Sequence, residues 1–185
     1  ADSPEGLNRE HALFGASRCV AVSPSDTAPA LVALDATMVV SSSSGERLIP
    51  AQDFFVGPDR DILNMTVLND DEILTAVRIP NTWANAEFYW EKVADRNVWD
   101  FALVNIAAVF KVSGGTIEDS RFACGAVECT PRRLETVESE VRGQQRSEEL
   151  AVSAGEIATD GARALNYNNF KIPLMQNLVK RAIRG

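Results

Sequence analysis

The feature that most constrains the fold is a pair of long β-rich runs joined by a glycine turn. Residues 102–112 are mostly apolar, and residues 116–127 form a second run of similar length. Ser113, Gly114 and Gly115 separate the two runs. Two glycines between such runs are typical of a β-hairpin. The sequence therefore predicts an antiparallel hairpin at the centre of the C-terminal half.

Helical patterns follow this hairpin. Residues 132–141, 148–165 and 169–183 are expected to be helices, and in the last of them Leu174 and Leu178 recur at four-residue spacing. Strands followed by helices are typical of an α+β fold. We expect an antiparallel sheet with three helices covering one face.

The first 80 residues contain shorter elements. A short helix is expected at residues 28–34, a hairpin at 37–49 around the turn SSSSG, and a helical turn at 51–55. The apolar stretches 62–68 and 72–79 predict two further strands, with turn residues between them and Pro80 after the second. Residues 81–86 resemble a linker. We therefore expect two domains, 1–80 and 81–185.

The charge balance limits the kinds of partner. The chain has 26 acidic and 18 basic residues, which gives a net charge of −8. Such a chain repels nucleic acid phosphates and anionic membrane surfaces. No run of about 18 apolar residues and no signal-peptide pattern occurs, so we expect a cytoplasmic protein. Arginine far exceeds lysine, a composition found in halophiles and equally in proteins of GC-rich genomes.

Two polar groups lie where a predicted strand ends. The turn SPSD (23–26) precedes a predicted helix, and free N–H groups at a helix start suit a diphosphate or a chain of hydroxyls. Asp26 can accept a hydrogen bond from a ligand hydroxyl, or it can cap its own helix. Lys92 can place a cation beside a ligand that gains negative charge, or it can form a surface ion pair of small worth.

Other features favour structural roles. Gly125 is expected to mark a close approach of another segment or a β-bulge. Core or interface packing, and not stacking on a ring, is expected of the aromatic residues Phe88, Tyr89, Trp90 and Trp99. A solvated helix surface is expected of the acidic residues Glu135, Glu138, Glu140, Glu148 and Glu149. The only histidine is His11, far from the thiols in sequence, and Cys124 and Cys129 lack zinc-site spacing. We therefore do not expect an enzyme acting alone through these thiols.

Five runs in order carry a family resemblance. They are NREHALFGASRCVAVSPSDTAPALVALDA, GERLIPAQDFF, NDDEILTAVRIP, EKVADRNVWDFALVNIAAVF and GAVECTPRRLE. Together they resemble the FAD-binding (medium) subunit of the molybdenum hydroxylases, which include xanthine dehydrogenase, aerobic carbon monoxide dehydrogenase and aldehyde oxidoreductases. The resemblance implies the rear part of an FAD-binding domain in 1–80 and the family's C-terminal domain in 81–185. The family's glycine-rich front portion has no counterpart here, so we expect a C-terminal part that alone binds FAD weakly or not at all.

The resemblance also implies roles for particular residues. The SPSD turn matches the family's contact with the ribityl and diphosphate part of FAD. Its residues are Ser23, Pro24, Ser25 and Asp26. Leu74 matches an aliphatic residue that packs on the isoalloxazine ring of the flavin. Lys92 matches a lysine near the pyrimidine edge of that ring, where a cation raises the reduction potential of the flavin. Cys19 ends the run NREHALFGASRC, which is similar to runs in relatives that hold an extra [4Fe–4S] cluster. It is expected to be a ligand of that cluster or a small buried thiol.

The function implied by the resemblance is electron transfer. A molybdenum-cofactor large subunit oxidises an aldehyde, heterocycle or acyl-CoA-type substrate, a small subunit carries [2Fe–2S] clusters, and this chain helps to hold FAD. No catalytic acid or base is expected in it. The alternative is a stand-alone interaction or assembly module that kept the fold and lost flavin. The absent front portion favours that alternative, whereas the presence of Asp26, Leu74 and Lys92 weighs against it.

Overall fold

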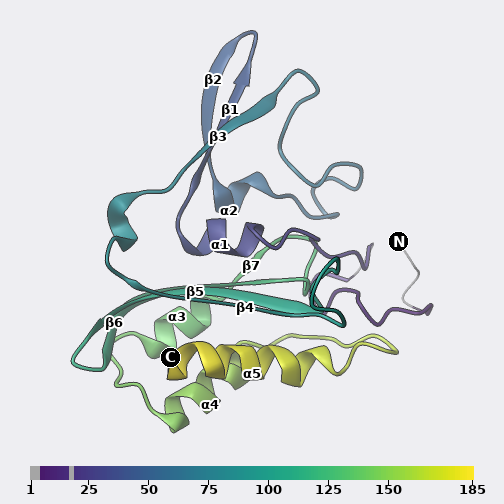
Figure 1. The fold of residues 1–185 in the computed structure, drawn as a ribbon. Helices are drawn as coiled ribbons and strands as arrows, with labels where there is room; N and C mark the ends of the chain where they lie inside the picture. Colours follow the sequence, from purple (N-terminus) through teal and green to yellow (C-terminus); the bar gives the residue numbers. More distant parts are fainter. Residues whose placement is uncertain (1–4, 17–18) are drawn as a thin grey trace.

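The structure is a computed structural model that describes residues 5–16 and 19–185. The first sheet is antiparallel and has the strand order β2-β1-β3 (Figure 1). The elements of this half are α1 (Ala28–Ala33), β1 (Thr37–Ser42), β2 (Gly45–Pro50), α2 (Ala51–Phe54), β3 (Ile73–Arg78) and the short 3-10 helix η1 (Asn81–Trp83).

The second sheet has the order β4-β5-β6-β7 and is also antiparallel. Its strands are β4 (Glu87–Val93), β5 (Val104–Ser113), β6 (Thr116–Gly125) and β7 (Arg132–Arg133), and the helices that follow are α3 (Glu135–Val141), α4 (Glu148–Ile157) and α5 (Lys171–Arg184). Figure 1 shows these three helices on one face of the sheet and α1 on the other. The predicted α+β fold, with three helices over an antiparallel sheet, is confirmed.

Alternating side chains of β5 explain this arrangement. Ile106, Ala108 and Phe110 pack in the core beneath α3–α5, whereas Ala107 faces α1 together with Ala123 of β6. Successive residues of a strand point to opposite faces of a sheet. Large side chains fill the helix-covered face, and alanines on the other face leave room for α1.

The predicted strand at 62–68 is absent from the structure. This segment is a loop in which only Thr66 forms an isolated bridge, to Phe55. The central strand β1 already has β2 and β3 on its two edges, so it offers no free edge to a further strand. Ile62 and Leu63 are exposed instead.

The region after β6 also differs from the prediction. Arg132 and Arg133 do not begin a helix but pair with β6 as β7, and α3 begins at Glu135. Glu138 of α3 is buried, not solvated: its carboxylate accepts hydrogen bonds from Phe122 N and from the Arg133 guanidinium, at 2.7–3.2 Å. The Arg133 side chain lies over the end of β6 and brings Glu138 inward.

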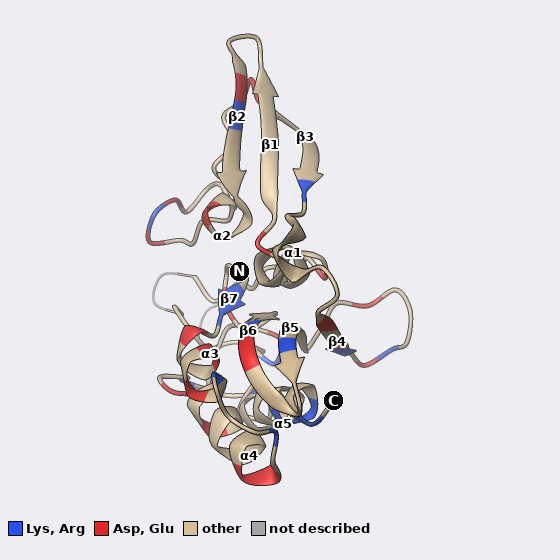
Figure 2. Ribbon diagram, turned by 90° about the vertical axis from the view of Figure 1, so that its left-hand side faces the viewer, with Lys and Arg blue, Asp and Glu red and all other residues tan. Residues whose placement is uncertain are grey.

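The remaining helices agree with the prediction except at one end. The helix α4 ends at Ile157, before the expected 165, and Gly161 in the following turn has a left-handed φ of +77°. Figure 2 shows acidic residues along α3 and α4, consistent with a solvated outer surface for most of them. In the described ranges, none of the helices is long and apolar enough to cross a lipid bilayer.

Candidate functional site

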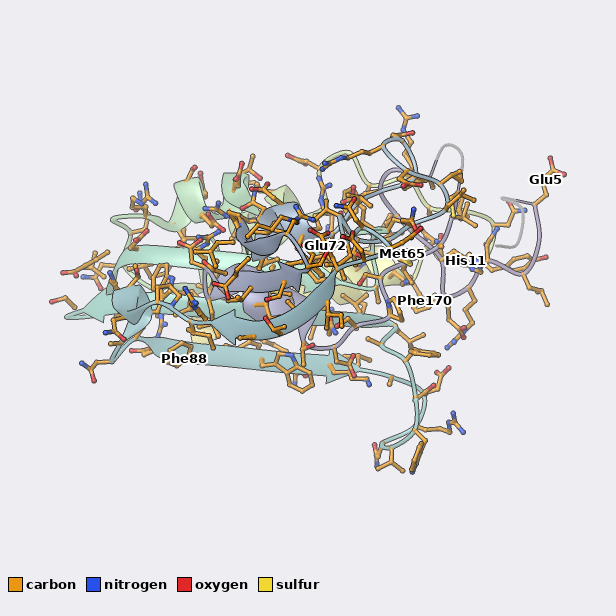
Figure 3. The ribbon with its side chains drawn as sticks, turned by 90° about the horizontal axis from the view of Figure 1, so that it is seen from above. Glu5, His11, Met65, Glu72, Phe88 and Phe170 are labelled. Atoms are coloured by element: carbon orange, nitrogen blue, oxygen red, sulfur yellow. The ribbon has the colours of Figure 1, made fainter. Side chains whose placement is uncertain are left out.

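A small cleft lies at one end of the second sheet. It is lined by residues 10–11, 21–24, 26, 101–102, 105 and 126, and it encloses about 160 Å³. In Figure 3, His11 of this cleft lies at the opposite end of the sheet from Phe88. The cleft thus lies where β4 ends, β5 begins and β6 ends.

A polar cluster forms the rim of this cleft. Lys92 of β4 is opposite Asn105 of β5 in the sheet, and Asn105 is opposite Gly125 of β6. Asp26 lies over this row: its Oδ2 accepts a hydrogen bond from Lys92 Nζ at 2.6 Å, and its Oδ1 accepts one from Asn105 Nδ2 at 3.2 Å. Lys92 Nζ also donates to the carbonyl of Asp100 at 2.7 Å. The structure therefore joins two of the predicted residues, Asp26 and Lys92, directly.

Gly125 makes this cluster possible. A Cβ atom at position 125 would lie 2.8 Å from Cγ of Pro29 in α1 and would overlap the side chain of Asn105. Real Cβ atoms essentially never approach other atoms so closely. The prediction of a close approach at Gly125 is confirmed, and the approaching groups are α1 and Asn105.

Asn105 was not among the predicted site residues. Its side chain is 1% exposed, and its Oδ1 has no hydrogen-bond partner within the described residues. His11 also lines the cleft, and its Nδ1 is likewise buried without a partner among the described residues. Buried polar atoms are nearly always hydrogen-bonded, so these two atoms are exceptions within the described residues. The signal in the sequence was a single amide in an otherwise apolar run.

The SPSD turn divides its functions among its residues. Ser25 Oγ accepts a hydrogen bond from Ala28 N at 3.2 Å, whereas Asp26 makes no capping bond to α1. Ser23 N donates to the carbonyl of Glu128 at 2.9 Å, so this N–H group is not free for a ligand. Ser23 and Pro24 line the cleft beside Asp26, but Ser25 does not.

The charges in the cleft favour hydroxyl groups over phosphate. Glu10 and Asp26 are acidic residues of the lining, with Asp26 paired to Lys92, and within the described ranges neither lysine nor arginine lines the cleft directly. Carboxylates accept hydrogen bonds from hydroxyls and repel phosphates. The cleft is also smaller than the roughly 300–1,000 Å³ typical of whole-ligand sites. It can therefore hold a polyhydroxyl part of a larger molecule.

Leu74 lies outside this cleft. It belongs to β3 in the first sheet, opposite Val40 of β1, and its side chain is partly exposed. The structure thus gathers Ser23, Pro24 and Asp26 with Lys92 and leaves Leu74 on a separate surface.

Two cysteines lie near the start of the SPSD segment. Cys19 and Cys129 are half-buried, and burial together with the nearby Cys19 thiol raises the pKa of Cys129 to about 11. A [4Fe–4S] cluster takes four cysteine ligands. In the part of the chain that the structure describes, no group of three or more metal-ligating side chains is gathered, so these residues do not by themselves fit such a cluster. Burial raises the pKa of Cys124 to about 12, as expected of an inert structural thiol.

Comparison with known proteins identifies the class to which this chain belongs. Residues 8–82 match the FAD binding domain in molybdopterin dehydrogenase, and residues 90–185 match the CO dehydrogenase flavoprotein C-terminal domain. Both are flavoprotein domains. The chain belongs to the family of FAD-binding medium subunits of the molybdenum hydroxylases.

Individual relatives agree with this assignment. The chain is 34% identical over 163 residues to the nicotine 6-hydroxylase medium subunit of Paenarthrobacter nicotinovorans, which covers 83% of this chain and 53% of that protein. The structure of this chain is similar to that of quinoline 2-oxidoreductase from Pseudomonas putida 86. The TM-score is 0.75 with 26% identity, and the match covers 97% of this chain and 58% of the other.

A further structural neighbour is a carbon monoxide dehydrogenase from Hydrogenophaga pseudoflava that lacks the Mo-pyranopterin moiety of its molybdenum cofactor. The TM-score is 0.74 with 28% identity, and the match covers 84% of this chain and 54% of the other. The chain spans about half the length of the curated relatives it matches.

Proposed function

We propose that this chain supplies part of the FAD site in the electron-transfer subunit of a molybdenum-dependent dehydrogenase or hydroxylase. The observation that carries the proposal is the cluster of Asp26, Lys92 and Asn105 at the rim of the cleft. FAD, when bound, would accept electrons from partner subunits and pass them to an acceptor.

Each residue of the cluster has a distinct task in this proposal. Asp26 accepts hydrogen bonds from hydroxyls of the ribityl chain, which suits the acidic lining of the cleft. Asn105 holds the Asp26 carboxylate in place and offers its free Oδ1 to a donor on the cofactor. Lys92 holds a positive charge at the end of β4, near the flavin. Ser23 and Pro24 shape the wall, Ser25 orders the turn, and Leu74 packs on the ring from β3.

The partners are a molybdenum-cofactor large subunit and a [2Fe–2S] small subunit. Family membership and the relatives that hydroxylate nicotine or oxidise quinoline support this part of the proposal, with an aldehyde, heterocycle or acyl-CoA-type substrate. We also propose that the enzyme is cytoplasmic and that this chain consists of two domains, residues 1–80 and residues 81–185. Because the cleft holds only part of a dinucleotide, residues 1–185 alone should bind FAD weakly and be inactive.

The test is FAD retention by the subunit isolated with its partners. Asp26→Ala should weaken FAD binding by about 1–3 kcal/mol, because it removes a hydrogen-bond acceptor from a partly buried site. Asp119→Ala is the matched control, since Asp119 pairs with Arg142 on an exposed part of β6 away from the cleft. Equal FAD dissociation constants for Asp26→Ala and the parent would contradict the proposal.

A second candidate function has one observation in its favour. The loop between β4 and β5 exposes Val98, Trp99 and Phe101, at 68%, 92% and 72%. Exposed aromatic residues are frequent anchors of protein interfaces. If the chain is an interaction module without flavin, Trp99→Ala should weaken binding to its partners. The isolated module should also contain no FAD. Stoichiometric FAD in the isolated subunit would exclude this alternative.

A further inference from the structure

Lys171, the first residue of α5, is a buried cation behind the cleft. Its side chain is fully buried, and its Nζ donates to three main-chain carbonyls. The distances are 2.9 Å to Glu10 O, 3.0 Å to His11 O and 2.6 Å to Ala126 O. All three donor positions of the ammonium group are therefore used.

The three carbonyls belong to the two segments that form one wall of the cleft. Glu10 and His11 line it from the N-terminal segment, and Ala126 lines it from the residue after β6. Ala126 has a left-handed φ of +61°, which is unfavourable for a residue with a Cβ atom. The short contact to Lys171 Nζ holds the Ala126 carbonyl in this conformation.

Main-chain bonds from Leu13 N and Phe14 N to Val127 O, at 2.8 and 3.1 Å, connect these segments farther along the chain, and the side-chain bonds of Lys171 add to them. Asn168 Nδ2 donates to His11 O and Ala12 O, both at 3.1 Å, but reaches no carbonyl near Ala126. Among the described side-chain hydrogen bonds, those of Lys171 alone join the two segments. Removal of the ammonium group would leave the buried carbonyls of Glu10 and Ala126 without this donor and that of His11 with Asn168 alone, which is unfavourable for buried acceptors.

Among the described residues, no carboxylate contacts this buried ammonium group. No described carboxylate hydrogen-bonds Lys171 Nζ; Glu10 favours its charge through space, and Arg9 opposes it. A buried charge held by backbone carbonyls is unfavourable compared with an apolar side chain of equal size. Such a group is expected where a particular backbone geometry is required.

We infer that Lys171 is a positioning residue of the cleft, which fixes the wall of Glu10, His11 and Ala126 and thereby sets the affinity for the part of FAD held there. The inference rests on the proposed function. Lys171 does not touch the ligand space, since its side chain lies behind the wall. The C-terminal helix α5 thus takes part in cofactor retention although no residue of it lines the cleft.

The test compares Lys171→Ala with two controls in the subunit isolated with its partners. Lys180→Ala removes the same charge from the same helix at a partly exposed position. Val141→Ala removes buried volume in α3, in the core on the helix-covered face. Two quantities are measured for each variant: the FAD dissociation constant, and hydrogen exchange of the amides of residues 11–13 and 126 in the FAD-free protein.

Chemical rescue separates positioning from a general loss of stability. Ethylammonium carries N–H donors and fits the space left in Lys171→Ala, whereas tetramethylammonium carries the same charge without donors. We expect Lys171→Ala to raise the FAD dissociation constant about tenfold or more, and ethylammonium but not tetramethylammonium to restore it. Lys180→Ala should match the parent, and Val141→Ala should lose stability with little change in FAD affinity.

The outcomes distinguish this inference from the proposed function. Unchanged exchange at residues 11–13 and 126 in Lys171→Ala would overturn the inference, whether or not FAD binds. Faster exchange with unchanged FAD affinity would also overturn it, while FAD binding itself would stand. If the parent subunit binds no FAD, the proposed function fails, and with it the assignment of the ligand to this cleft.

Discussion

Lys92 and Asp26, 66 residues apart in the chain, form an ion pair in which Lys92 Nζ lies 2.6 Å from Asp26 Oδ2. The lysine side chain is 21% exposed and the aspartate side chain 39%. The family resemblance assigns these residues to different parts of one cofactor. Because they are bonded to each other, the charge of each is partly offset by the other, and a change in one alters the effect of its partner.

The first prediction concerns the flavin potential. Lys92→Ala should lower the reduction potential of bound FAD by roughly 20–50 mV, since a cation near the ring stabilises the anionic reduced form. Asp26→Asn should raise it, because Lys92 then acts without its counter-charge. A redox titration of the isolated subunit measures both, with Lys111→Ala on β5 as the control. Equal potentials for Lys92→Ala and the parent would exclude Lys92 from the flavin site.

The second prediction concerns Gly125. Gly125→Ala should destabilise the protein by about 1–3 kcal/mol, because the added Cβ atom must displace α1 or Asn105. FAD affinity should fall with it, since Asn105 positions Asp26. The control is Gly57→Ala, where the atom nearest the new Cβ would be Thr130 Cγ2 at 4.0 Å, an ordinary van der Waals contact. Urea unfolding and FAD titration give the two quantities, and a neutral Gly125→Ala would refute the packing argument.

The third prediction concerns the buried carboxylate of Glu138. Glu138→Ala should lower the free energy of unfolding by about 1–3 kcal/mol, because it leaves the buried Phe122 N–H without its acceptor and Arg133 with only Glu135 and Gln52 as partners. Glu140→Ala, on the exposed side of the same helix, should change it by less than about 1 kcal/mol. Similar losses for both variants in urea unfolding would mean that burial of Glu138 is unimportant.

The fourth prediction is a pH dependence of stability. Burial lowers the pKa of Lys171 from 10.5 to about 8, with Glu10 raising it and Arg9 lowering it. The buried ammonium therefore opposes folding below pH 8, and this penalty is relieved as the pH rises from 8 towards 10.5. The free energy of unfolding of the parent should increase over this window relative to Lys171→Met, by on the order of 3 kcal/mol.

The comparison with Lys171→Met removes other alkaline titrations from the result. Burial raises the pKa of Tyr89 to about 12, and this group titrates in both proteins. Chemical unfolding at several pH values between 7 and 10 gives the difference. Parallel curves for the two proteins would show that the ammonium group has the same pKa in the folded and unfolded chain.

The sequence alone determined the sheet, its helices and the location of the SPSD turn. The hairpin of β5 and β6, the amphipathic pattern of α5 and the demand for glycine at position 125 follow from local periodicity and turn chemistry. The five family-like runs are also local features. Predictions failed where local signals were ambiguous, as in the apolar loop at 62–68 and in the arginines that form β7.

Only the tertiary structure decided which side chains meet. Asn105 and Asp26 are 79 residues apart, and Lys171 is 161 residues from Glu10, yet each pair is hydrogen-bonded. Glu138 looked solvated because its burial depends on where Arg133 lies after β6 turns back. The identity of a residue limits which bonds it can form. The bonds formed between distant residues depend on how the sheets and helices pack together.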